Sequence, residues 1–176
     1  MPSNPLAMLR LNAVEILRQP GTSREIAGPL SIEPLEVDDE RISGDVDVAL
    51  TAVSSVDGVV VHGSVRTPWA TQCRRCLVDV AGVAESEVDE LFQYNLTNEE
   101  ANQIDGDLIE LAPIVREYVL LELPVGPLCR PDCAGICPEC GADRNESPCS
   151  CDNTVDDIRW AALEGWRLDD QPNSES

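Results

Sequence analysis

The cysteines carry the chemistry that this sequence makes visible. Six of the eight lie in a dense run from Cys129 to Cys151, and the other two form a separate C-x2-C pair. Two cysteines separated by two residues can hold one metal ion, because the chain turns back on itself and backbone N–H groups inside the turn donate to the sulfurs. Four thiolates close a tetrahedral site around Zn²⁺, which suits sulfur ligands and needs no redox chemistry.

The dense run contains one complete set of four ligands. Cys137 and Cys140 are followed by Gly141, which can adopt the positive φ that such a turn needs, and a polar loop then leads to Cys149 and Cys151. We predict one zinc site from these four cysteines and a second site from the two remaining pairs. The second site would pin the C-terminal segment to the middle of the chain. Its four ligands would be Cys73, Cys76, Cys129 and Cys133.

Other interpretations of the same cysteines stay open. An iron–sulfur cluster also takes four cysteines, eight cysteines permit a disulfide framework, and the six local cysteines can be divided differently. Arg74 and Arg75 lie between Cys73 and Cys76, where their charges would lower the thiol pKa of a redox pair. However, no βαβ pattern surrounds this pair, as a thioredoxin-like motif requires. C-x2-C pairs are more typical of metal sites than of disulfides, which favours zinc.

The composition describes a globular and very acidic chain. Of the 176 residues, 43% are hydrophobic and 3% aromatic, so the core has to consist mostly of Val, Leu, Ile and Ala, which suits a β-rich structure. The 33 acidic residues outnumber the 12 basic ones, all arginine, and the net charge is -21. This charge repels nucleic-acid phosphates at long range. It favours basic protein partners; the alternative is a charged surface that serves solubility alone.

We expect a cytoplasmic protein without membrane or DNA partners. The N-terminal residues lack a charged segment followed by an apolar segment and a cleavage site. No apolar run approaches the roughly 18 residues that are needed to cross a bilayer. Reducing conditions in the cytoplasm would keep the thiols available for metal.

Strand-like alternation surrounds the first C-x2-C pair. Residues 46–56 and 59–69 alternate apolar and polar side chains, with Asp57-Gly58 as the turn between them, and residues 78–92 form a third strand. The pattern predicts an antiparallel meander, either an open sheet or a partial barrel, with the cysteine pair at one hairpin end.

Helical and irregular segments flank the meander. Residues 9–17 alternate in part and predict a strand, whereas residues 22–43 are expected to connect elements. The apolar residues between 107 and 123 follow a helical period, and Pro113 fits the first turn of a helix that covers the core face of the sheet. A short helix is expected over residues 158–166.

The predicted fold class is therefore α+β, in three parts. Residues 1–128 form a β-rich domain with its covering helix. Residues 129–168 form a Cys-rich zinc-binding segment with a short helix, and residues 169–176 form a disordered tail.

Several motifs in this order resemble the YceD family, whose bacterial and plastid members are named for large ribosomal RNA accumulation. The motifs are C-R-R-C-L from Cys73, V-R-E-Y-V-L-L-E-L-P from Val115 and D-C-A-G-I-C-P-E-C-G from Asp132, and the resemblance covers residues 9–166. It implies a role in making or stabilising large-subunit ribosomal RNA. The implied partners are ribosomal or assembly proteins of the large subunit, with RNA contacted directly or through them.

We therefore expect a ribosome-biogenesis factor with structural zinc and no enzymatic activity. The chain has no lysine and no phosphate-binding loop, and its single histidine, His62, falls on the polar face of a predicted strand, as a surface residue would. Two alternatives stay open. One is a zinc-thiol redox sensor that releases metal on oxidation, and the other is a metal-dependent RNA-processing enzyme that uses carboxylates.

Overall fold

The computed structural model describes residues 6–152 and residue 159. The chain forms two compact units, residues 1–133 and residues 134–176. The predicted domain boundary between residues 128 and 129 stays a prediction. Apart from residue 159, the helix expected over 158–166 and the tail expected over 169–176 lie outside the described residues.

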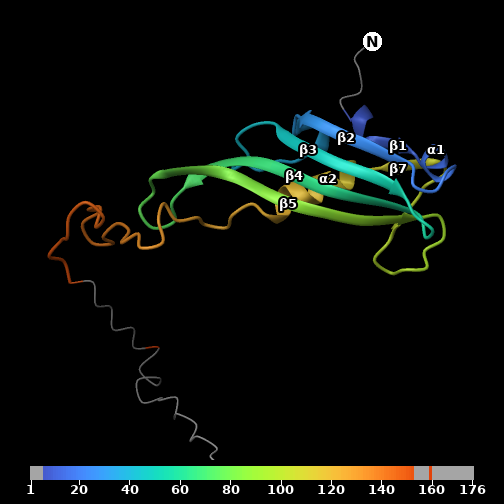
Figure 1. The fold of residues 1–176 in the computed structure, drawn as a ribbon. Coiled ribbons are helices and arrows are strands. Elements are labelled where there is room, and N and C mark those ends of the chain that lie inside the picture. Colours follow the sequence, from blue (N-terminus) through green and yellow to red (C-terminus); the bar gives the residue numbers. More distant parts are fainter. Residues whose placement is uncertain (1–5, 153–158, 160–176) are drawn as a thin grey trace, which may run out of the picture. The chain divides into compact units, whose positions relative to one another are not determined.

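An antiparallel meander forms the frame of the first unit (Figure 1). Strands β2 (Ser23–Leu30), β3 (Val46–Ser54), β4 (Val59–Gln72) and β5 (Asp79–Gln93) lie in this order, each antiparallel to its neighbour. The short strand β6 (Asn102–Gln103) adds to the end of β5 in the parallel direction. The sheet is therefore open and mixed, with the predicted meander as its main part.

Alternation along β3 and β4 decides which face of the sheet is buried. His62 and Arg66 are exposed on one face, and their cross-strand partners on β5, Asp89 and Glu85, are exposed beside them. The opposite face supplies the core, as the sequence predicted. Its buried residues on the two strands include Val46, Val48, Leu50, Ala52, Val59, Val61 and Val65.

One main helix, α2 (Ala112–Leu121), contacts β4 and β5 and lies behind them in Figure 1. Pro113 lies in its first turn, as predicted, and the helix buries Ile114, Val115 and Val119. The helix begins later than predicted because the preceding residues form a strand, β7 (Leu108–Glu110), which pairs with β1 (Arg10–Asn12).

The strand predicted over residues 9–17 is wrong in its second half. A 3-10 turn, η1 (Ala7–Leu9), precedes β1, and helix α1 (Ala13–Leu17) follows it. The side-chain oxygen of Asn12 accepts the N–H of Glu15 at 3.0 Å and caps this helix. The first N–H groups of a helix have no partner inside the helix, and Asn12 satisfies that of Glu15. This cap favours a helix start at Ala13 over a continued strand.

The expectation of connecting structure over residues 22–43 is also wrong, because β2 lies there, followed by the 3-10 turn η2 (Glu33–Leu35). Only Ile26 and Leu30 of β2 are buried, so the strand carries little apolar alternation. Pro29 is tolerated because β2 is the edge strand of the sheet, where a missing N–H breaks no ladder.

The turn between β3 and β4 lies one residue earlier than predicted. Ser55 donates its N–H to the carbonyl of Gly58 at 2.8 Å, so the reversal is centred on Val56 and Asp57. The opposite end of the hairpin formed by β4 and β5 extends further than β3. It closes after the pair Gln72–Asp79, which places the first C-x2-C pair at the tip, as the sequence predicted.

Candidate metal centres

Eight thiols gather in two groups of four. In each group all four sulfur atoms lie within 4.8 Å of one another. All eight cysteines lie in the described part of the chain, and none forms a disulfide. The first centre consists of Cys73, Cys76, Cys129 and Cys133, and the second of Cys137, Cys140, Cys149 and Cys151. The cysteine spacing predicts the same two sets; their role as metal ligands stays a prediction.

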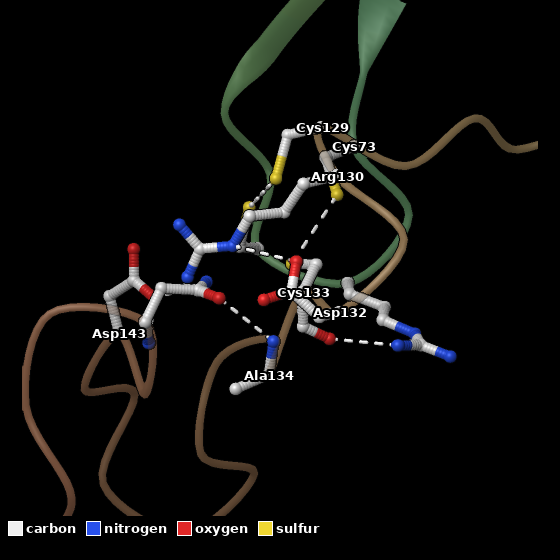
Figure 2. Close-up of polar contacts among 10 residues, drawn as sticks. Cys73, Cys129, Arg130, Asp132, Cys133, Ala134 and Asp143 are labelled. Carbon is white, nitrogen blue, oxygen red and sulfur yellow. Dashed lines mark hydrogen bonds and ion pairs between the residues drawn. The ribbon is translucent and has the colours of Figure 1, made fainter.

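The first centre joins the tip of the β4–β5 hairpin to the segment that follows α2 (Figure 2). The Sγ of Cys73 lies 3.8 Å from the Sγ of Cys133, and the Sγ of Cys76 lies 3.6 Å from that of Cys129. These residues are 60 and 53 positions apart in sequence. The centre therefore depends on the tertiary structure of the whole first unit.

The sulfur separations fit one tetrahedral ion. Four sulfurs at about 2.3 Å from Zn²⁺ lie roughly 3.8 Å from one another, close to the two distances in the first centre. A cluster of several irons fills the space between its ligands and forces the sulfurs further apart. Each group thus offers four sulfur donors around the space of a single ion.

The two C-x2-C turns have the same backbone hydrogen bonds. In both, the residue after the second cysteine donates its N–H to the carbonyl of the first cysteine at 2.9 Å. The first cysteine donates its own N–H to a carbonyl five residues further on at 2.8 Å. The residue after the second cysteine has a positive φ in each turn, 62° at Leu77 and 73° at Gly141.

One thiol of each centre loses its proton easily. Burial disfavours the Cys73 thiolate, but backbone N–H groups, first that of Cys76, outweigh burial and lower the pKa of Cys73 to about 6. In the second centre a backbone hydrogen bond from Cys140 is the main cause that lowers the pKa of Cys137 to about 6. Each centre therefore has one thiolate that can bind an incoming cation first.

Another thiol of each centre holds its proton strongly. Burial, together with the neighbouring thiols, raises the pKa of Cys129 to about 12. Hydrogen bonds with the thiols of Cys140 and Cys137, together with burial, raise the pKa of Cys151 to about 12. Four negative sulfurs require a cation among them, so metal binding has to release protons.

Arg74, Arg75 and Arg130 lie in the two segments that carry the first centre. The Nη1 of Arg75 donates to the carbonyl of Cys133 at 2.8 Å, and the backbone N–H of Arg74 donates to the carbonyl of Pro127 at 3.0 Å. Arg130 pairs with Asp132 at 3.4 Å (Figure 2). The sequence indicated Arg74 and Arg75 only as local charges, and it did not predict their contacts with the distant segment that carries Cys129 and Cys133.

A set of hydrogen bonds made by the Arg41 side chain, which we call the Arg41 brace, positions the segment that leads to Cys129. The guanidinium of Arg41 donates to the Asp39 carboxylate at 2.9 and 2.6 Å, and its Nη1 donates to the carbonyl of Pro124 at 3.0 Å. The hydrogen bonds from Arg41 hold the pKa of Asp39 below its usual value. Pro124 lies between α2 and Cys129, so the brace positions the chain as it approaches the centre.

The loop of the second centre is held by two polar side chains. The Oδ1 of Asp143 accepts the backbone N–H of Asn145 at 2.8 Å and its Nδ2 at 2.7 Å. The Oδ1 of Asn145 in turn accepts the N–H of Ala134 at 2.8 Å (Figure 2). The sequence predicted a polar loop here, and the structure identifies the side chains that stabilise it.

Together, an open sheet built mainly from a meander and two groups of four cysteines, each able to hold a metal ion, define a small Cys-rich type of protein. The chain belongs to the YceD family: the model of the large ribosomal RNA subunit accumulation protein YceD matches residues 61–166. The match includes both centres. No helix of the described residues is long and apolar enough to cross a membrane.

Relatives of the chain include proteins of Mycobacterium species and of Bacillus subtilis. An uncharacterized protein of Mycobacterium tuberculosis is 33% identical over 159 residues, which are 83% of this chain and 75% of the relative. One of Mycobacterium leprae is 33% identical over 138 residues, 74% of this chain and 62% of the relative. The protein YlbN of Bacillus subtilis is 31% identical over 108 residues, 58% of this chain and 59% of the relative. No solved structure matches the chain.

Proposed function

We propose that this protein is a non-enzymatic ribosome-biogenesis factor that supports the synthesis, processing or stability of large-subunit ribosomal RNA. The observation that carries the proposal is that each centre offers four protein ligands, a complete tetrahedral set. Each group offers four thiols within 4.8 Å, and four protein ligands leave no coordination position for water or substrate. This favours a structural over a catalytic use of the metal. The ribosomal role comes from the description of the family.

Zinc is the metal that we assign to both centres. Four thiolates around one ion are typical of structural Zn²⁺, and the two sulfur separations in the first centre match its bond lengths. All eight cysteines would be ligands. In the first centre zinc would hold the hairpin tip to the segment after α2, and in the second it would hold a segment that has few apolar residues of its own.

A basic protein is the partner that the charge distribution favours. The exposed face of the sheet presents Glu85, Glu87 and Asp89 along β5, in a chain with a net charge of -21. Ribosomal and assembly proteins that bind ribosomal RNA need basic surfaces, to which this face is complementary. We place this interaction in the cytoplasm, with part of the contact to ribosomal RNA made through the partner.

Capture of the tagged full chain from native lysate tests the proposal. We expect enrichment of large-subunit precursor RNA and large-subunit proteins, with two zinc ions per purified chain. Ribonuclease treatment separates the contacts, since a partner bound through protein stays on the tagged chain after the RNA is removed. Capture of no ribosomal component, or magnesium-dependent cleavage of precursor RNA by the purified protein, would contradict the proposal.

A further inference from the structure

The two C-x2-C turns differ at the residue that adopts a positive φ. The second turn has Gly141 there, whereas the first has Leu77. A left-handed backbone costs a residue other than glycine roughly 1–2 kcal/mol. Burial does not compensate for this cost, because Leu77 is 53% exposed and Val78 is 50% exposed. An apolar side chain kept exposed on a strained backbone points to a contact outside the chain.

Two arginines of the same turn have no acidic partner. Among the described residues no carboxylate lies within ion-pair distance of Arg74 or Arg75, and both are exposed. Arg18 and Arg24 also lack an ion pair among the described residues, but they lie six positions apart in the sequence, whereas five other arginines of the first unit pair with an aspartate or glutamate. These are Arg10, Arg41, Arg66, Arg116 and Arg130. The turn is thus a local positive site on an acidic molecule.

Both arginines are anchored near the backbone. Arg75 uses Nη1 for the carbonyl of Cys133, which leaves most of the five N–H donors of its guanidinium for another acceptor. The side chain of Arg74 runs along Gly126, where an added Cβ would lie 3.1 Å from the Cδ of Arg74. Anchored side chains lose less entropy on binding, so the turn is prepared to take up an anion.

We propose that the turn from Cys73 to Val78, the first knuckle, contacts single-stranded RNA. The guanidinium groups of Arg74 and Arg75 bind phosphate oxygens, which their planar donors match. Leu77 and Val78 provide an apolar surface for an unstacked base, which single strands offer and duplexes do not. Duplex DNA is disfavoured because its stacked bases offer no face to Leu77 and Val78, and because its higher charge density strengthens the repulsion by the net charge of -21.

The proposal rests on the proposed function, because it names the RNA contact of that ribosomal role. Its test uses the zinc-loaded full chain and a short fluorescent single-stranded RNA at low ionic strength. The double variant R74Q/R75Q is compared with R18Q/R24Q. Arg18 and Arg24 are also exposed, and no ion pair involves them among the described residues. Both variants carry the same net charge, so the long-range repulsion is equal and only the local contact differs.

We expect R74Q/R75Q to bind the RNA roughly tenfold more weakly than the parent, as the loss of two exposed charge pairs implies. The control R18Q/R24Q should remain close to the parent. Zinc content is measured for each variant, since Arg75 also contacts Cys133. The single variant Arg74→Gln, which leaves that contact in place, should still weaken binding about threefold.

The variant Leu77→Gly distinguishes an RNA-contacting role of Leu77 from a purely structural role. Glycine relieves the backbone strain and removes the exposed side chain, so a purely structural role predicts equal or higher stability with unchanged RNA affinity. Our proposal predicts retained zinc and stability with roughly threefold weaker RNA binding, because the apolar surface under the base is lost.

Three outcomes would overturn the proposal: no RNA binding by the parent, equal losses in both double variants, or binding of an acidic peptide in place of RNA with the same dependence on the knuckle. The lysate experiment distinguishes this failure from failure of the proposed function. If knuckle variants capture large-subunit components as well as the parent does, the ribosomal role stands and the RNA contact does not.

Discussion

The first centre draws its ligands from the β4–β5 hairpin and from the segment after α2, whereas the second draws all four from one short stretch. Cys76 and Cys129 are 53 positions apart, but only eight residues separate Cys140 from Cys149. A cross-link removes more entropy from the unfolded chain when it closes a longer loop. The same four-thiol chemistry should therefore stabilise the whole sheet in the first unit and only a local segment in the second.

The contacts around the two centres differ in the same way as their ligands: they are long-range in the first centre and local in the second. Arg75 and the Arg41 brace link the first centre to distant parts of its unit, whereas Asp143 and Asn145 hold the second through local contacts. The first turn also places a leucine where the second has glycine. The same type of turn can therefore support long-range stability and expose an apolar side chain in one unit, and support local folding in the other.

Removing one ligand from each centre should give the largest contrast. Cys133→Ser should lower the free energy of unfolding of the sheet by about 3–4 kcal/mol, because a long closed loop is opened. Cys151→Ser should change it by less than about 0.5 kcal/mol. Each variant should retain one of two zinc ions. Zinc analysis and urea unfolding followed by circular dichroism measure both effects, and equal destabilisation would contradict the division into two roles.

Arg41→Ala tests the long-range brace of the first centre. It removes two bonds to the Asp39 carboxylate and one to the carbonyl of Pro124, and we expect a loss of about 1.5 kcal/mol. Asp38→Ala, a change at an exposed neighbour, is the control and should be close to neutral. An equal loss in both variants would show that the brace is not the cause.

The brace also predicts a pH dependence. The folded-state pKa of Asp39 is lowered by Arg41, so its contribution is complete above the unfolded value of about 3.9 and is lost as the pH falls through the folded pKa. The stability difference between the parent and Arg41→Ala should therefore shrink in acid. Urea unfolding of both proteins from neutral pH to below pH ~3 tests this sign, and a difference that grows in acid would contradict it.

Asp143→Ala should weaken the second centre alone. The change removes two hydrogen bonds to Asn145, whose own oxygen holds the N–H of Ala134. Loss of a group that supports a metal ligand loop typically lowers metal affinity about tenfold or more. In a chelator competition, one zinc ion should be extracted roughly tenfold more easily and the other as in the parent. If both ions were extracted more easily than from the parent, the two centres would depend on each other, which would contradict this prediction.

Exchanging the residues at the positive φ positions should give the smallest effects. Gly141→Ala should cost roughly 1 kcal/mol through backbone strain alone, since a Cβ there meets no atom within 4 Å. Leu77→Gly should be stabilising by about 0.5 kcal/mol, because relief of strain exceeds the added freedom of the unfolded chain. Thermal unfolding of each unit measures these shifts. A loss of stability in Leu77→Gly would show that Leu77 contributes packing.

Local patterns predicted much of the frame. Alternation in β3 and β4 is visible because one face is buried over most of β3 and over the first part of β4. Pro113 indicates a helix start because its missing N–H costs nothing there. The edge strand β2 was missed because only two of its side chains are buried. Its pairing with β3 is a long-range property that alternation does not encode.

The sequence by itself determined the chemistry of this protein: the type of ligand, the two C-x2-C turns and the acidic charge, which depend on residue identity and short spacing. Only the tertiary structure decided which distant thiols meet, which carbonyl Arg75 contacts and that Leu77 is exposed on a left-handed backbone. The first two features depend on contacts between segments more than fifty positions apart. Such contacts form only when the sheet and α2 have buried their shared core.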